Sequence, residues 1–136
     1  MKKIIIAIVA LMCTISLQAK GDLHLISIDN KSGAVTPLSI EDALVANGFA
    51  VDLNSEMNLP FTKQFKETSF KVFTLMTFHH NTLALELVKK YPQAGVITPM
   101  GIGIYQGLNE NTLHVSILTA EAQGKILGIK TPILKK

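Results

Sequence analysis

Alternating and stripe-like hydrophobic patterns divide most of the chain into short strands and helices. The strongest strand pattern is at 70–78, where large apolar side chains occupy both faces, as in a central strand. Two later alternating runs flank a polar, glycine-containing turn at 107–111, which predicts a β-hairpin. Strands are therefore predicted at 23–28, 49–54, 70–78, 99–106 and 112–118.

Four segments have the pattern of helices. The clearest is 81–91, where Asn81 can cap the start and Pro92 ends the helix. One apolar stripe along it is formed by Leu83, Ala84, Leu87, Val88 and Tyr91. On its other side Glu86 and Lys90 lie four residues apart, a spacing that favours an ion pair.

The other predicted helices are shorter, at 39–47, 58–65 and 119–125. In the first, Ser39 is a candidate cap and Gly48 a stop signal. Strands and helices alternate at first, and a hairpin follows near the end. This order predicts an α+β fold, a mixed or antiparallel sheet with helices packed on one face.

The N-terminus has the features of a secretory signal peptide. A basic start at Lys2 and Lys3 precedes an apolar run that ends at a small residue, Ala19. The run is shorter than the roughly 20 residues that a membrane-spanning helix needs. We therefore expect cleavage after Ala19, a single mature domain at 20–136 without a stable membrane anchor, and a periplasmic or secreted location. The alternative is an uncleaved N-terminal anchor.

The amino-acid composition excludes several classes of function. The chain of 136 residues has 13 lysines, no arginine and 10 acidic residues, for a formal net charge of +3. Removing residues 1–19 takes away two lysines, no acidic residue and Cys13, which leaves a net charge of +1 and no cysteine. Thiol nucleophiles, disulfides and thiolate metal sites are thereby excluded from the mature chain. A nearly neutral chain without arginine is also a poor candidate for nucleic-acid binding.

Several motifs resemble those of the domain-of-unknown-function family 302 (DUF302). They are 42–44 with 48–51, 83–87, and the specific stretch Tyr91-Pro92-Gln93-Ala94-Gly95-Val96-Ile97-Thr98-Pro99. The resemblance covers roughly residues 23–128 and implies a small α+β domain of the TATA-binding-protein-like type, with no established activity. The chain departs from the family at Asn81-Thr82, where members often have Asn-Pro, and at Pro99-Met100, where they often have Pro-Cys.

Glycines within one predicted strand mark a candidate binding face. Gly101, Gly103 and Tyr105 share one face of the strand at 99–106, and His114 and Ser116 share a face of the partner strand. If the apolar residues of both strands form the core, these five residues form a platform for a small ligand or a second subunit. The alternative is a solvated sheet face.

A second candidate site lies where the strongest strand meets the helix at 81–91. His79, His80 and Met100 supply imidazole and thioether groups suited to copper or a haem iron, and Met76 is a further thioether candidate. The alternatives are a loop that tolerates the two rings and methionines that fill the core.

The sequence leaves three classes of function open. The first is an exported small binding or accessory domain whose small-molecule or protein partner is unknown. The second is a periplasmic metal or haem binder that uses the histidines and Met100. The third is a hydrolase-like enzyme with a histidine base, in which Asp52 or Glu86 assists. The chain lacks nucleophile-elbow, dinucleotide and phosphate-loop motifs, which favours a protein that is not an enzyme.

Overall fold

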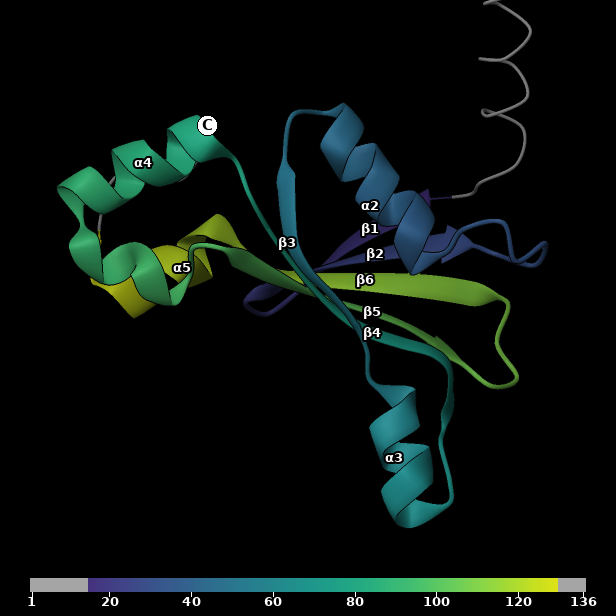
Figure 1. Cartoon of the computed structure of the whole chain (residues 1–136). Helices are drawn as coiled ribbons and strands as arrows, with labels where there is room; N and C mark the ends of the chain where they lie inside the picture. The colour runs from purple at the N-terminus through teal and green to yellow at the C-terminus, as the bar shows by residue number, and fades with distance from the viewer. Residues whose placement is uncertain (1–14, 130–136) are drawn as a thin grey trace, which may run out of the picture.

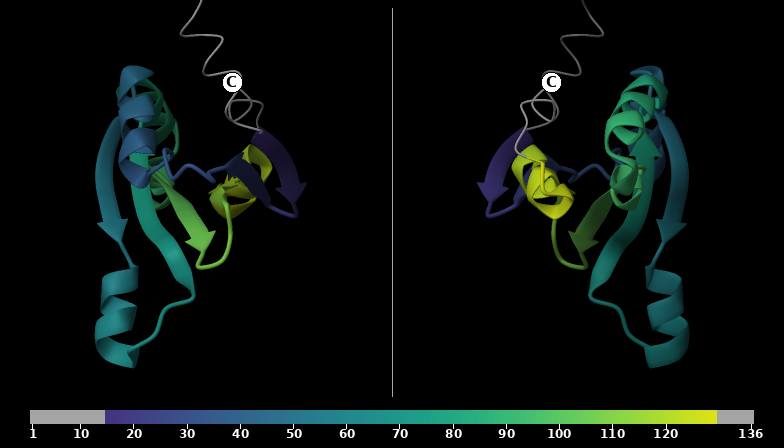
Figure 2. Two further views of the ribbon diagram at one scale, coloured as in Figure 1. Left: turned by 90° about the vertical axis from the view of Figure 1, so that its right-hand side faces the viewer. Right: turned by 90° about the vertical axis from the view of Figure 1, so that its left-hand side faces the viewer.

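A computed structural model describes residues 15–129, which form one antiparallel sheet flanked by helices (Figure 1). The sheet order is β1-β2-β6-β5-β4-β3, and every neighbouring pair is antiparallel. The strands are β1 (Ile15–Lys20), β2 (Leu23–Asp29), β3 (Ala50–Glu56), β4 (Phe70–His79), β5 (Met100–Gly107) and β6 (Thr112–Leu118). The sheet is strongly twisted, so β3 and β4 lie apart from β1 and β2 in the side views (Figure 2).

The helices occupy three separate places around this sheet (Figure 1). They are α2 (Pro37–Ala46), α3 (Asn58–Phe65), α4 (Asn81–Lys90), the 3₁₀ helix η1 (Pro92–Val96) and α5 (Ala120–Leu127). Helix α2 lies over one face of the sheet, which we call the core face, while α4 and α5 both lie toward one end of the strands (Figure 1) and are separate from each other in the side views (Figure 2). Helix α3 projects on the other side, where Phe61 stacks on Phe73 of β4 with ring centroids 5.9 Å apart.

The core lies between the central strands and α2. Its buried members are Met76, Phe78, Ile102, Ile104, Leu113 and Val115. They alternate along β4, β5 and β6, as the period-2 pattern requires, and Ile40 and Leu44 of α2 pack against them. The opposite side of the sheet, the outer face, therefore carries the residues between these positions.

The predicted α+β class is confirmed, with six antiparallel strands and four α-helices in residues 15–129. The N-caps predicted for two helices, Ser39 and Asn81, are wrong. Helix α2 begins earlier, because Thr36 is its N-cap and forms a reciprocal capping box with Ser39. The N-cap of α4 is His80, which makes no side-chain cap bond. Asn81 is the first helical residue, and its side chain bonds His79 instead of capping the helix.

The N-terminal segment differs most from expectation. Residues 1–14 of the predicted signal peptide lie outside the described residues, but Ile15–Lys20 form the edge strand β1, paired along its whole length with β2. Cleavage after Ala19 stays a prediction, and it would remove all of β1 except Lys20.

None of the helices in residues 15–129 is both long enough and apolar enough to cross a bilayer.

Candidate functional site

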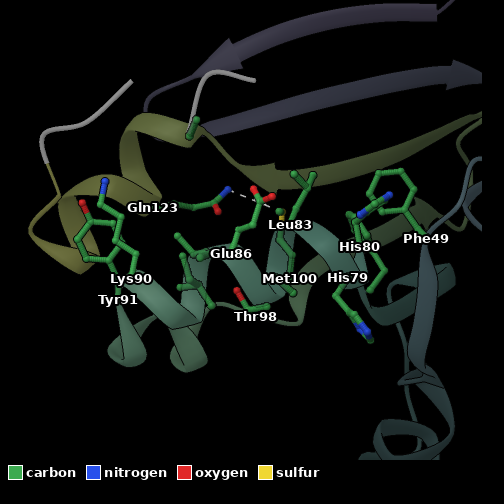
Figure 3. A pocket seen from close by; sticks show the side chains of 15 residues that line it. Phe49, His79, His80, Leu83, Glu86, Lys90, Tyr91, Thr98, Met100 and Gln123 are labelled. Carbon is green, nitrogen blue, oxygen red and sulfur yellow. Dashed lines mark hydrogen bonds between the residues drawn. The ribbon is translucent and has the colours of Figure 1, made fainter. Parts of the chain in front are cut away.

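A cavity of about 620 Å³ opens between α4 and α5, at the end of the sheet. We call it the α4–α5 cavity (Figure 3). Its apolar wall includes Leu83, Ala84 and Leu87 of α4, and Met100 rises between the two helices. No residue of α4 is fully buried, because the apolar stripe of this helix faces the cavity instead of a packed core. A volume of this size, with mostly apolar walls and few polar groups, is typical of small-molecule sites.

The polar group that stands out in this cavity is the ring of His80. Its Nδ1 atom is buried and has no hydrogen-bond partner, alone in this respect among the side-chain atoms of residues 15–129. The ring packs edge-on against Phe49, with centroids 5.7 Å apart, which fixes its position at one end of the cavity (Figure 3). Since a buried polar atom without a partner costs free energy, this nitrogen needs a hydrogen bond that the folded chain does not supply.

His79 also lines the cavity, but its ring points to the opposite side of the strand–helix junction from that of His80 (Figure 3). A β-bulge in β3, between Val51 and Leu53, turns Asp52 toward it. His79 Nδ1 lies 2.7 Å from Asp52 Oδ2, and Nε2 lies 2.7 Å from Asn81 Oδ1. The hydrogen bond to Asp52, followed by that to Asn81, raises the pKa of His79 above its usual 6.5, because a protonated ring can donate to both oxygens.

The predicted metal ligands are therefore close together but not equally available. His79, His80 and Met100 all line the cavity, yet both ring nitrogens of His79 have partners. The Met100 sulfur accepts a long hydrogen bond of 3.7 Å from Gln123 Nε2, and Met76 is fully buried in the core. Within residues 15–129, no three His, Cys, Asp or Glu side chains are grouped as a metal site requires. Copper or haem binding stays a prediction.

The far end of the cavity carries a cationic side chain, that of Lys90. Lys90 and Tyr91 line it at the end of α4, and the Lys90 ammonium lies 5.4 Å from the centre of the Tyr91 ring. The predicted Glu86–Lys90 ion pair is absent from the ion pairs of the described residues. Both side chains instead border the cavity separately (Figure 3).

The predicted glycine-lined platform lies on the outer face. Tyr105 stacks on His114, with centroids 5.0 Å apart. His114 Nε2 lies 2.6 Å from Glu110 Oε1, and its Nδ1 lies 2.9 Å from the Ser27 hydroxyl. Since a carboxylate can only accept, Nε2 donates to Glu110, and Nδ1 accepts from the Ser27 hydroxyl in the tautomer that has its proton on Nε2. The hydrogen bond from His114, together with the Gly107 amide, lowers the pKa of Glu110.

The hydrogen-bonded series Ser27–His114–Glu110 contains the residue types of a hydrolase triad, so it is relevant to the hydrolase hypothesis. Ser27 lies in the middle of β2, between β1 and β6, so the surrounding backbone amides belong to sheet pairs. A hydrolase that forms an acyl-enzyme needs free donors near its nucleophile to stabilise the oxyanion. The hydrolase class stays a prediction, with Asp52 and His79 as the acid–base pair that the structure brings together.

The two glycines of this platform have different neighbours. A Cβ atom at Gly103 would lie 2.9 Å from the Ser116 hydroxyl, whereas one at Gly101 would meet only Leu75, at 3.9 Å. At Gly103 the group that packs over the strand is therefore a side chain of the same sheet. Whether a ligand or a subunit covers this face stays a prediction.

Sequence reasoning did not assign the α4–α5 cavity. The stripe on α4 was visible, but it predicts burial and gives no indication that α5, some 30 residues further on, forms the opposite wall. Ser27 was also not assigned, because its partner His114 is 87 residues away in sequence. Glu110 was not assigned although it lies only four residues from His114, because it belongs to the predicted turn at 107–111.

Comparison with known proteins supports the fold and gives no function. No known family model matches the chain, and no curated protein matches it. The crystal structure of an uncharacterized conserved DUF302 protein from Bacillus stearothermophilus is similar, with a TM-score of 0.67 and 13% identity. The match covers 85% of this chain and 86% of that chain. The DUF302-like fold predicted from the motifs is thus confirmed, and the TATA-binding-protein-like label stays a prediction.

Proposed function

We propose that this protein is an exported binding domain that takes a small, mostly apolar molecule into the α4–α5 cavity. The observation that carries this proposal is an apolar cavity of about 620 Å³ with a buried, unpartnered nitrogen, His80 Nδ1, at one end. Apolar walls supply affinity by removing ligand surface from water, and one hydrogen bond fixes the ligand's orientation. The ligand therefore carries an apolar body that lies along α4 and a hydrogen-bonding group at the His80 end. Because Nδ1 is shielded from solvent, the His80 ring has to turn to bond that group.

Two features of the cavity support a ligand in this place. The Leu83 side chain is 54% exposed although it lies on the cavity wall, so the empty protein leaves apolar surface in contact with water. The Gln123 amide reaches toward Met100 from the opposite wall, which gives a ligand a polar contact on that side as well. The export part of the proposal is supported by the basic and apolar start of the chain.

Two neighbouring leucines of α4 give a matched test. Leu83 and Leu85 are almost equally exposed, at 54% and 53%, but only Leu83 lines the cavity. The probe is N-phenyl-1-naphthylamine, an uncharged apolar dye that fluoresces in dry sites. We expect Leu83→Asp to weaken its binding by at least about tenfold, or 1.4 kcal/mol, and Leu85→Asp to leave it nearly unchanged.

The comparison of the two variants distinguishes binding in the cavity from nonspecific binding of the dye to exposed apolar surface. Equal losses in the two variants, or no dye binding by the unmodified protein, would contradict the proposal. Native mass spectrometry of protein purified from its natural compartment then identifies the bound mass, and a metal or haem would be detected in the same spectrum.

A further inference from the structure

The edge strand β1 belongs to the segment that export is expected to remove. It pairs with β2 through all six of its residues, and β2 is its only neighbour in the sheet. Cleavage after Ala19 leaves only Lys20 of this strand. In the mature chain β2 would then be the edge strand of the sheet in place of β1.

The rest of the domain does not depend on β1 for its core. Ile15 and Leu17 face the same side as Ile28 and Ile26 of β2, yet they are 65% and 67% exposed. Neither belongs to the hydrophobic core cluster. Losing this strand therefore removes little buried apolar area, and the sheet from β2 to β3 keeps its packing.

Loss of β1 would leave β2 as an unprotected edge. Strand β2 pairs continuously with its neighbours on both sides, without a bulge, and it contains no proline or lysine. Charges, prolines and bulges are the devices that keep exposed edges from pairing with other chains. Apart from Asp29 at its end, β2 has none of them.

We propose that the mature protein covers this edge by pairing β2 with β2 of a second copy, in an antiparallel and twofold symmetric manner. The proposal rests on the export part of the proposed function and is independent of cavity binding. In such an isologous pair both subunits use the same strand, so pairing β2 with β2 provides hydrogen-bond partners for the edge of each subunit.

The side-chain pattern of β2 suits a copy of itself. With Ile26 at the twofold axis, Ile26 faces Ile26 and Ile28 faces His24, so the core-side row stays largely apolar. In the structure the same row is completed by Leu17 opposite Ile26 and Ile15 opposite Ile28. No two like charges lie opposite each other in this register, because Asp29 faces Leu23 of the other copy.

The experiment compares two chains, one beginning at Lys20 and one beginning at Ile15. Light scattering after size-exclusion chromatography should show a dimer for the first chain and a monomer for the second, which carries its own edge strand. Since the mature chain has no cysteine, a single Ile26→Cys substitution gives a clean site for a short bismaleimide crosslinker. Crosslinked dimer should form only in the chain that begins at Lys20.

Asn54→Cys serves as the control, because Asn54 is exposed on β3, the other edge of the sheet. Crosslinking at Asn54, or a monomeric mature chain, would overturn the proposal. If Ile26→Cys fails to fold, hydrogen exchange of residues 23–29 in the unmodified mature chain replaces it, with protection expected to increase with protein concentration. An exported protein whose intact mass retains residues 15–19 would also overturn the proposal, while leaving the cavity test unaffected.

Discussion

The outer sheet face and the α4–α5 cavity both contain histidine, but the surroundings of the two rings differ. On the outer face, His114 bonds Ser27 and Glu110 through its two nitrogens. In the cavity, His80 Nδ1 is buried without a partner. A satisfied network needs no ligand to be stable, whereas an unsatisfied group beside an apolar cavity gains from one. This difference favours the cavity over the glycine-lined outer face as the proposed binding site.

The largest effect is expected at Gly103 on the outer face. Gly103→Val should destabilise the protein by about 1–2 kcal/mol, because its Cβ would lie 2.9 Å from the Ser116 hydroxyl, which would have to rotate and give up its bond to the Gly103 carbonyl. Gly101→Val should be tolerated, since the nearest atom there is 3.9 Å away. Urea denaturation of the two variants measures the difference.

A second substitution tests whether crowding against Ser116 causes the loss of stability in Gly103→Val. Adding Ser116→Gly to Gly103→Val removes the crowding atom and should recover most of the lost stability. If both single variants are equally stable but only one of them loses a bound molecule, the outer face is a binding surface, which would contradict the proposed site in the cavity.

The same substitution in the two regions should have opposite effects. His114→Phe should lower stability by about 1 kcal/mol, because it leaves Glu110 and Ser27 without their partner. His80→Phe should keep the ring contact with Phe49 and remove the unpaired nitrogen, so it should raise the stability of the empty protein by a similar amount.

The two histidine substitutions should also differ in their effect on ligand binding. His80→Phe should weaken the binding of any ligand that bonds the ring nitrogen, while His114→Phe should not change it. Thermal unfolding followed by fluorescence, with and without the dye or the natural ligand, tests both variants. A lower melting temperature for empty His80→Phe would mean that the nitrogen has a partner in solution.

Local patterns predicted the strands and most of the helices because each depends on nearby residues. The alternation in 70–78 and the stripe on 81–91 are examples, and both elements form within a residue or two of the expected bounds. β1 was not predicted, since its residues also fit the end of a signal peptide. Asp52 was a candidate partner for a histidine, but its pairing with His79 was not predictable. A bulge turns Asp52 toward His79, and alternation cannot reveal an extra residue in a strand.

The smallest expected effect is a pH dependence that differs in sign between the two regions. Near the cavity, the hydrogen bond to Asp52 raises the pKa of His79 above its usual 6.5. A raised pKa means that the folded state holds the proton more tightly, so His79 contributes stability below pH 6.5 that is lost as the pH rises through its folded-state pKa. The His79 and Asp52 side chains are partly exposed, at 24% and 36%, so solvent screens the pair and the contribution is small.

On the outer face the sign is reversed. The hydrogen bond from His114 lowers the pKa of Glu110 below its usual 4.5, so its contribution is present above that value and is lost as the pH falls through the lowered pKa. We therefore expect His79→Gln to cost more stability at about pH 5 than at about pH 9, and Glu110→Gln to cost more at about pH 7 than at about pH 3. Denaturant titrations at these values, with Asp52→Asn as the control that removes the first partner of His79, test the two signs separately. A His79→Gln cost that stays constant with pH would mean that the Asp52 contact does not hold the proton, and the ring would then be available as a ligand beside His80.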